Sequence, residues 1–124
     1  MKKMTTVLLV EQIEPCLDFW VRRLGFTKTV EVPDEDRLGF VILVNGAVEV
    51  MLQTYRSVAK DAPGSAAPAP SVTNLYAEVE NLEQVIAKLD GLPVILPRRQ
   101  AFYGADEIGV REPGGHHVVF AQFG

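Results

Sequence analysis

The stretch Val10-Glu11-Gln12-Ile13-Glu14-Pro15-Cys16-Leu17 returns later in the chain as Val79-Glu80-Asn81-Leu82-Glu83-Gln84-Val85-Ile86. The apolar positions recur 69 residues on, so that Ile13, Cys16, Leu17 and Trp20 become Leu82, Val85, Ile86 and Leu89. The same offset carries Gly46, Val50 and Gln53 onto Gly115, Val119 and Gln122. Two copies of this length indicate a duplicated half-domain, because a solenoid needs three or more repeats.

Each copy has the pattern of a strand, a helix and three further strands. In the first copy, Pro15 suits the first turn of a helix, and Gly25 is placed to end that helix. The strands of this copy are predicted at 4–10, 27–32, 38–44 and 47–54, with Asn45-Gly46 as a hairpin turn. In the second copy, Asn81 can cap the helix, and the predicted strands are 72–79, 93–96, 106–111 and 116–122.

The predicted fold class is therefore α+β, built from two tandem βαβββ modules. We expect the modules to form a cupped mixed sheet, with one helix per module on the convex face. The 124 residues are one domain of ordinary size, with module 1 at about 4–56, a proline-containing linker at 57–71 and module 2 at 72–124.

Charge and composition exclude several classes of protein. The net charge of −4 and the pI of about 5.1 argue against nucleic-acid binding, which requires clustered Lys and Arg, and Arg98-Arg99 has the pattern of a solvated surface pair. The one cysteine, Cys16, cannot form an intramolecular disulfide, and together with Trp20 it lies on the apolar stripe of the first helix. No apolar run approaches the roughly 20 residues of a membrane span, so we expect a cytoplasmic protein without membrane association.

Four stretches resemble the vicinal oxygen chelate superfamily, which contains glyoxalase I, extradiol dioxygenases, fosfomycin-resistance enzymes and bleomycin-resistance proteins. They are Leu17-Asp18-Phe19-Trp20 leading to Leu24-Gly25-Phe26, Val79-Glu80-Asn81-Leu82, Tyr103-Gly104, and Glu112-Pro113-Gly114-Gly115-His116. The last resembles the Asp-Pro-Asp-Gly turn of the family. The resemblance spans nearly the whole chain, but the superfamily contains lyases, isomerases, dioxygenases, transferases and plain binding proteins, so it implies the fold more than the function.

The resemblance also implies four metal-ligand positions, which fall on Thr5, Val50, Asn74 and Val119. None of these is His, Glu or Asp, and valine offers no lone pair, so we expect no bound metal and no cofactor. One register stays open at this point. The repeat favours Val50 in the cup, whereas the alternation along 47–54 favours a one-residue slip that would place Glu49, Met51 and Gln53 there.

Eight residues are predicted to bind a small-molecule ligand, and none is assigned a catalytic role: Glu49, Met51, Asn74, Tyr76, Phe102, Tyr103, Glu107 and His117. In the strand 72–79, alternation directs Asn74, Tyr76 and Glu78 to the face opposite the helix. The competing interpretation is that the carboxylates lie at exposed edges and that the aromatic rings pack in the core. His116, at the turn, is predicted to lie at the surface, while its neighbour His117 points to the opposite face.

Three functions are compatible with this pattern. The first is a metal-free protein that binds a small molecule, resembling the bleomycin-resistance branch, in which a homodimer sequesters an antibiotic or an aromatic or cationic metabolite. The second is an enzyme of the lyase, isomerase or dioxygenase type, with a non-standard metal site or with Glu49 or Glu107 as a general base. The third is a structural or regulatory dimer.

Overall fold

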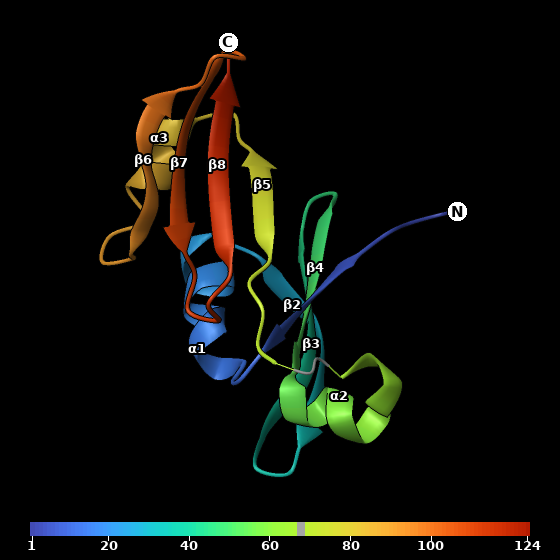
Figure 1. Ribbon diagram of the computed structural model, residues 1–124. Coiled ribbons are helices and arrows are strands. Elements are labelled where there is room, and N and C mark those ends of the chain that lie inside the picture. Colours follow the sequence, from blue (N-terminus) through green and yellow to red (C-terminus); the bar gives the residue numbers. More distant parts are fainter. Residues whose placement is uncertain (67–68) are drawn as a thin grey trace. The chain divides into compact units, whose positions relative to one another are not determined.

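The computed structural model describes residues 1–66 and 69–124, which divide into two compact units, Met1–Ser71 and Val72–Gly124. Each unit contains a four-stranded mixed sheet, with the strand orders β1-β4-β3-β2 and β5-β8-β7-β6 (Figure 1). The two orders are equivalent, since each unit pairs its first strand with its last. This arrangement confirms the predicted α+β fold of two βαβββ modules.

The sheet of the first unit consists of β1 (Thr6–Val10), β2 (Thr27–Asp34), β3 (Arg37–Asn45) and β4 (Val48–Thr54). β1 pairs with β4 in parallel, and the other two pairings are antiparallel. The residues of one sheet face are almost fully buried: Leu8, Val10, Val41, Leu43, Val50 and Leu52. β-branched and leucine side chains of this kind account for both the strand preference and the core of this unit.

The helix of the first unit begins as α1 (Glu14–Leu17) and continues as the π-helical segment η1 (Asp18–Arg23). Pro15 lies in the first turn as predicted, and Gly25 ends the helix with φ of +79°, a conformation that favours glycine. Ile13, Cys16 and Trp20 are buried, which confirms that the predicted apolar stripe belongs to the core, and Phe19 is buried as well.

A further helix, α2 (Tyr55–Asp61), directly follows β4 and was not anticipated from the sequence. Thr54 is the last residue of β4 and also the cap of α2, because its hydroxyl accepts the amide N–H of Ser57 at 3.1 Å. A short 3₁₀ turn, η2 (Pro63–Ser65), comes next. The predicted linker 57–71 thus starts inside a helix, and its residues 67 and 68 lie outside the described residues.

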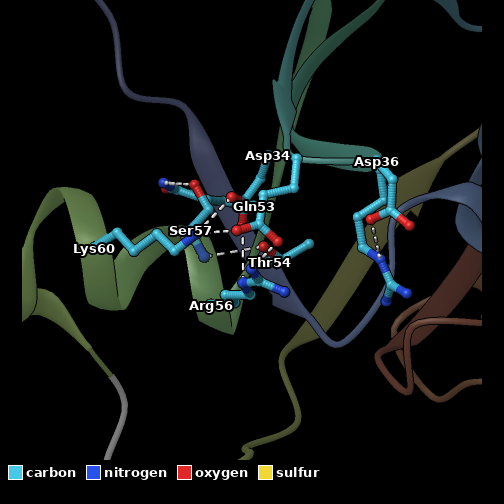
Figure 2. Close-up of polar contacts among 9 residues, drawn as sticks. Asp34, Asp36, Gln53, Thr54, Arg56, Ser57 and Lys60 are labelled. Atoms are coloured by element: carbon cyan, nitrogen blue, oxygen red, sulfur yellow. Dashed lines mark hydrogen bonds and ion pairs between the residues drawn. The ribbon is translucent and has the colours of Figure 1, made fainter.

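Ion pairs fix α2 to the hairpin between β2 and β3. Figure 2 shows the Asp34 carboxylate facing Lys60, whose Nζ lies 2.7 Å away, and Arg56, whose Nε lies 3.6 Å away. A Cβ atom on Gly39 would approach the Cβ atoms of Asp34 and Ser57 to 2.9 and 3.3 Å, so glycine permits this close packing. Since each carboxylate here faces a cation of the same unit, we interpret the cluster as structural.

The second unit contains β5 (Asn74–Glu78), α3 (Leu82–Ile86), β6 (Val94–Gln100), β7 (Ala105–Arg111) and β8 (His117–Phe123). Asn81 caps α3 as predicted, since its side-chain oxygen accepts the N–H of Gln84 at 3.1 Å. The side-chain oxygen of Gln122 accepts the N–H of Leu82 at 2.7 Å, which fixes the start of α3 against β8. Val110, Val118 and Phe120 are buried on this side of the sheet.

The pairing of first and last strands differs by one residue between the units. Thr6 pairs with Val50 in the first unit, whereas Tyr76 pairs with Val119 in the second. Residues of β1 and β5 that are 69 positions apart therefore lie on equivalent faces of their sheets. Residues of β4 and β8 that are 69 positions apart lie on opposite faces. A slip of one residue exchanges the two faces of a strand. Consequently the repeat misplaced Val50, which lies on the buried face.

Among the residues that the structure describes, no helix combines the length and the apolar character that crossing a lipid bilayer requires.

Candidate functional site

A buried carboxylate, Glu107, lies at the centre of the most concentrated polar cluster in the second unit. Glu107 is on β7 and is 0% exposed. Its Oε1 accepts hydrogen bonds from Arg99 Nε and from the Tyr103 hydroxyl, each at 2.8 Å. Its Oε2 accepts the Tyr76 hydroxyl at 2.8 Å and the Tyr103 hydroxyl at 2.7 Å. Both oxygens are therefore satisfied, as a buried charge requires.

Tyr76 reaches Glu107 across an intervening strand. Tyr76 is on β5 and pairs with Val119, while Glu107 pairs with Ala121, so β8 lies between the two side chains. Neighbouring strands are about 4.8 Å apart, so the phenol must span roughly twice that distance. The alanine opposite Glu107 leaves room for this crossing.

Exposed aromatic rings gather beside the carboxylate. Tyr76 is 51% exposed and Tyr103 is 44% exposed, although both hydroxyls bind Glu107. Phe102 is fully exposed and packs edge-on against Tyr103 at 5.0 Å between ring centroids. Phe123, at the end of β8, lies 6.3 Å from Tyr103 by the same measure. A contiguous group of exposed rings is typical of a binding surface.

The contacts set the charge state of the cluster. Burial raises the pKa of Glu107, but the hydrogen bonds from Tyr103, Tyr76 and Arg99 outweigh it, so the pKa lies below its ordinary value of 4.5. The pKa of Tyr76 is raised, first by burial and then by its hydrogen bonds to Tyr103 and Glu107. Near neutral pH the site therefore carries the Glu107 carboxylate beside the neutral Tyr76 phenol.

This depressed pKa predicts a pH dependence of stability. A carboxyl group whose pKa is lower in the folded than in the unfolded protein stabilises the fold above its unfolded pKa. That contribution is lost as the pH falls from about 4.5 through the folded value. We expect Glu107→Gln to lose less stability than the unchanged protein between pH 6 and pH 3. Urea unfolding at several pH values measures this, and parallel pH profiles for the two proteins would contradict it.

Two further predicted ligand-binding residues share the face of Glu107. Asn74 pairs with His117 in the β5–β8 ladder, and the Asn74 Oδ1 lies 3.2 Å from the His117 Nδ1. Within the second unit, hydrogen bonds thus join Tyr76, Tyr103 and Glu107, with Phe102 packed against Tyr103. Asn74 and His117 contact each other at the first residue of β8, away from Ala121, and do not contact this cluster.

Glu49 and Met51 belong to the first unit and lie on the face of β4 opposite Val50. The Thr5 hydroxyl donates to Glu49 Oε1 at 3.0 Å, and Lys3 Nζ lies 2.8 Å from Oε2. These contacts, with Lys3 first, lower the pKa of Glu49. Within the first unit, β4 therefore presents Glu49 on the face that carries Thr5, and Val50 on the buried face.

The metal positions implied by the family resemblance do not assemble a ligand set within either unit. In the first unit, Val50 points away from the face that carries Thr5 and Glu49. Among the described residues, no group of three or more His, Cys, Asp and Glu side chains could hold a metal ion. The donors present therefore do not fit the divalent metal of the superfamily's enzymes.

Arg99 and His116 differ from their predicted placement. The pattern Arg98-Arg99 indicated a solvated pair, yet Arg99 binds the buried Glu107, and Arg98 lies 2.9 Å from Asp106. Each arginine precedes its carboxylate by eight residues across the same hairpin, a cross-strand charge pattern that could have identified both pairs. His116 is buried, not at the surface, because its Nδ1 accepts the N–H of Thr73 at 3.0 Å.

Solved structures with the same fold have widely different names. At 18% identity, the chain resembles TioX from Micromonospora sp. ML1, with a TM-score of 0.78 and 98% of each chain covered. A glyoxalase/bleomycin resistance protein/dioxygenase from Nocardioides gives a TM-score of 0.75 at 18% identity, covering 97% of this chain and 82% of the other. A lactoylglutathione lyase from Agrobacterium tumefaciens gives 0.77 at 14% identity, covering 97% and 92%. At these identities the likeness establishes the fold alone.

No protein of curated function matches the chain. The family model of the Glyoxalase/Bleomycin resistance protein/Dioxygenase superfamily, however, matches residues 4–120, which is nearly the whole sequence. Together with the two βαβββ modules, this match identifies the chain as a member of the Glyoxalase/Bleomycin resistance protein/Dioxygenase superfamily.

Proposed function

We propose that this protein binds a planar aromatic cation at the aromatic face of the second unit, and that it sequesters this ligand without transforming it. The observation that carries the proposal is the buried Glu107 carboxylate, held under two half-exposed phenols with Phe102 and Phe123 alongside. A planar ligand can stack on such rings, and a positive charge is attracted both to their faces and to the carboxylate.

Charge supports a cation over an anion. Glu78, on the same face of β5, is exposed, and it pairs with Ala121, the same residue that pairs with Glu107. Two carboxylates therefore flank one strand, while the chain as a whole has a net charge of −4. An anionic ligand would have to approach both carboxylates.

The pKa directions support binding over catalysis. A general base that works near neutral pH has a raised carboxyl pKa, usually through burial without compensating donors. Both glutamates proposed as bases have lowered pKa values instead, Glu107 through Tyr103, Tyr76 and Arg99 against the effect of burial, and Glu49 through Lys3 and Thr5. The predicted homodimer and the cup between the modules stay predictions.

A matched series of two-ring probes tests the proposed function. We expect 1-methylquinolinium to bind about tenfold more tightly than neutral 1-naphthol, and 1-naphthoate to bind most weakly, in calorimetric titrations at low salt. In NMR spectra, the cation should shift the ring resonances of Tyr76, Tyr103 and Phe123. A preference for the anion, or shifts confined to residues 1–71, would contradict the proposal.

A further inference from the structure

Arg99, on the strand next to Glu107, supplies a cation to this carboxylate from within the same unit. Its Nε and its Nη2 both lie 2.8 Å from Oε1, while the partners of Oε2 among the described residues are the hydroxyls of Tyr76 and Tyr103. A guanidinium that binds a carboxylate at full strength uses both oxygens in a fork geometry. Arg99 therefore makes a one-sided contact, which is weaker than the pairing that this carboxylate can accept.

Arg99 is also placed where its guanidinium can move away from Glu107 into solvent. The arginine side chain is 52% exposed, whereas that of Glu107 is 1% exposed. β6, which carries Arg99, is the edge strand of its sheet, and its pairing with β7 is irregular between Leu96 and Arg99. A half-exposed guanidinium on an edge strand can turn into water at little cost, because water solvates it well.

We infer that Arg99 is an internal substitute for the cationic group of the ligand, an inference that rests on the proposed function. In the free protein, the guanidinium neutralises Glu107. On binding, the positive group of the ligand takes its place beside Oε1, and Arg99 moves into solvent. The carboxylate of Glu107 therefore faces one positive charge both before and after binding. An unpaired buried carboxylate would be strongly destabilising, and this exchange avoids it.

This role predicts that Arg99 weakens binding. A site that is competent for only a fraction of the time has an apparent affinity reduced by that fraction. An arginine that instead contacted the ligand, or that merely held Glu107 in position, would strengthen binding. The two roles therefore predict opposite signs for the effect of removing the guanidinium.

The test is Arg99→Met, which keeps an unbranched apolar stem and removes the charge. Its matched control is Arg98→Met, since Arg98 lies beside it but contacts Glu83 at 2.6 Å and Asp106 at 2.9 Å. In calorimetric titrations with 1-methylquinolinium at pH 7.5, we expect Arg99→Met to bind about tenfold more tightly. We expect Arg98→Met to stay within about twofold of the unchanged protein.

A second measurement requires no variant. In the unchanged protein, the Nε–H of Arg99 should exchange with water faster at saturation with 1-methylquinolinium than it does before the probe is added. Equal or weaker binding by Arg99→Met, or an Nε–H whose exchange does not accelerate at saturation, would overturn the inference while leaving the proposed function standing. Failure of the unchanged protein to bind the probe would overturn both.

Discussion

Phe19→Ala is expected to lower the free energy of unfolding by about 3–5 kcal/mol, the range for removing a fully buried aromatic ring. Phe19 is completely buried in η1 and packs edge-on against Trp20 at 5.0 Å, and Trp20 in turn packs against Phe26 at 5.3 Å. Removing the ring leaves a cavity and breaks a chain of edge-to-face contacts. Guanidinium unfolding followed by circular dichroism measures the loss, which corresponds to about 10–20 °C in Tm.

Phe102→Ala provides the matched control, because it removes the same ring from a fully exposed position. We expect that substitution to change the stability by no more than about 0.5 kcal/mol. Similar losses of unfolding free energy for both variants would mean that the ring contacts of Phe19, Trp20 and Phe26 do not stabilise the first unit.

Glu107→Gln is expected to weaken the binding of 1-methylquinolinium by about 100-fold, since removing one member of a buried charge pair has effects of this size. Glutamine is nearly the same size and keeps one acceptor oxygen for the phenols. It lacks the charge, however, and its NH₂ group would face either Arg99 or the incoming cation. The loss therefore measures the electrostatic contribution of the carboxylate and not its shape.

Glu78→Gln separates this local effect from the overall charge. It removes one negative charge from the same sheet face. Glu78 is exposed, however, and lies on β5, which β8 separates from the strand that carries Glu107. We expect at most a threefold loss of affinity, which salt should further reduce. Comparable losses for the two variants would attribute binding to long-range charge and would contradict a site centred on Glu107.

Sequence reasoning succeeded where one residue determines a local conformation. Asn81 as a cap and Gly25 as a helix end each depend on a side chain or a φ angle that few residues supply, and both predictions are confirmed. Alternation along β5 likewise placed Asn74, Tyr76 and Glu78 on one face, because the period of a strand is two residues.

The sequence did not reveal features that depend on pairing between distant segments. The register of β4 depends on its ladder with β1, and the repeat pattern alone was one residue out. α2 was missed because it has a single buried residue, Val58, and hence no apolar stripe, although Thr54 was an available cap signal. Arg99 was missed because a charge on an edge strand has the same pattern whether it is solvated or paired.

The crossing of Tyr76 over β8 provides a criterion for comparing relatives. Tyr76 pairs with Val119 and Glu107 pairs with Ala121, so the small side chain at position 121 favours this crossing. Superfamily members that combine tyrosine, alanine and glutamate at the three equivalent positions should therefore share the ligand class proposed for this protein. Members with a bulky residue in place of the alanine should have diverged in what they recognise, however similar their folds.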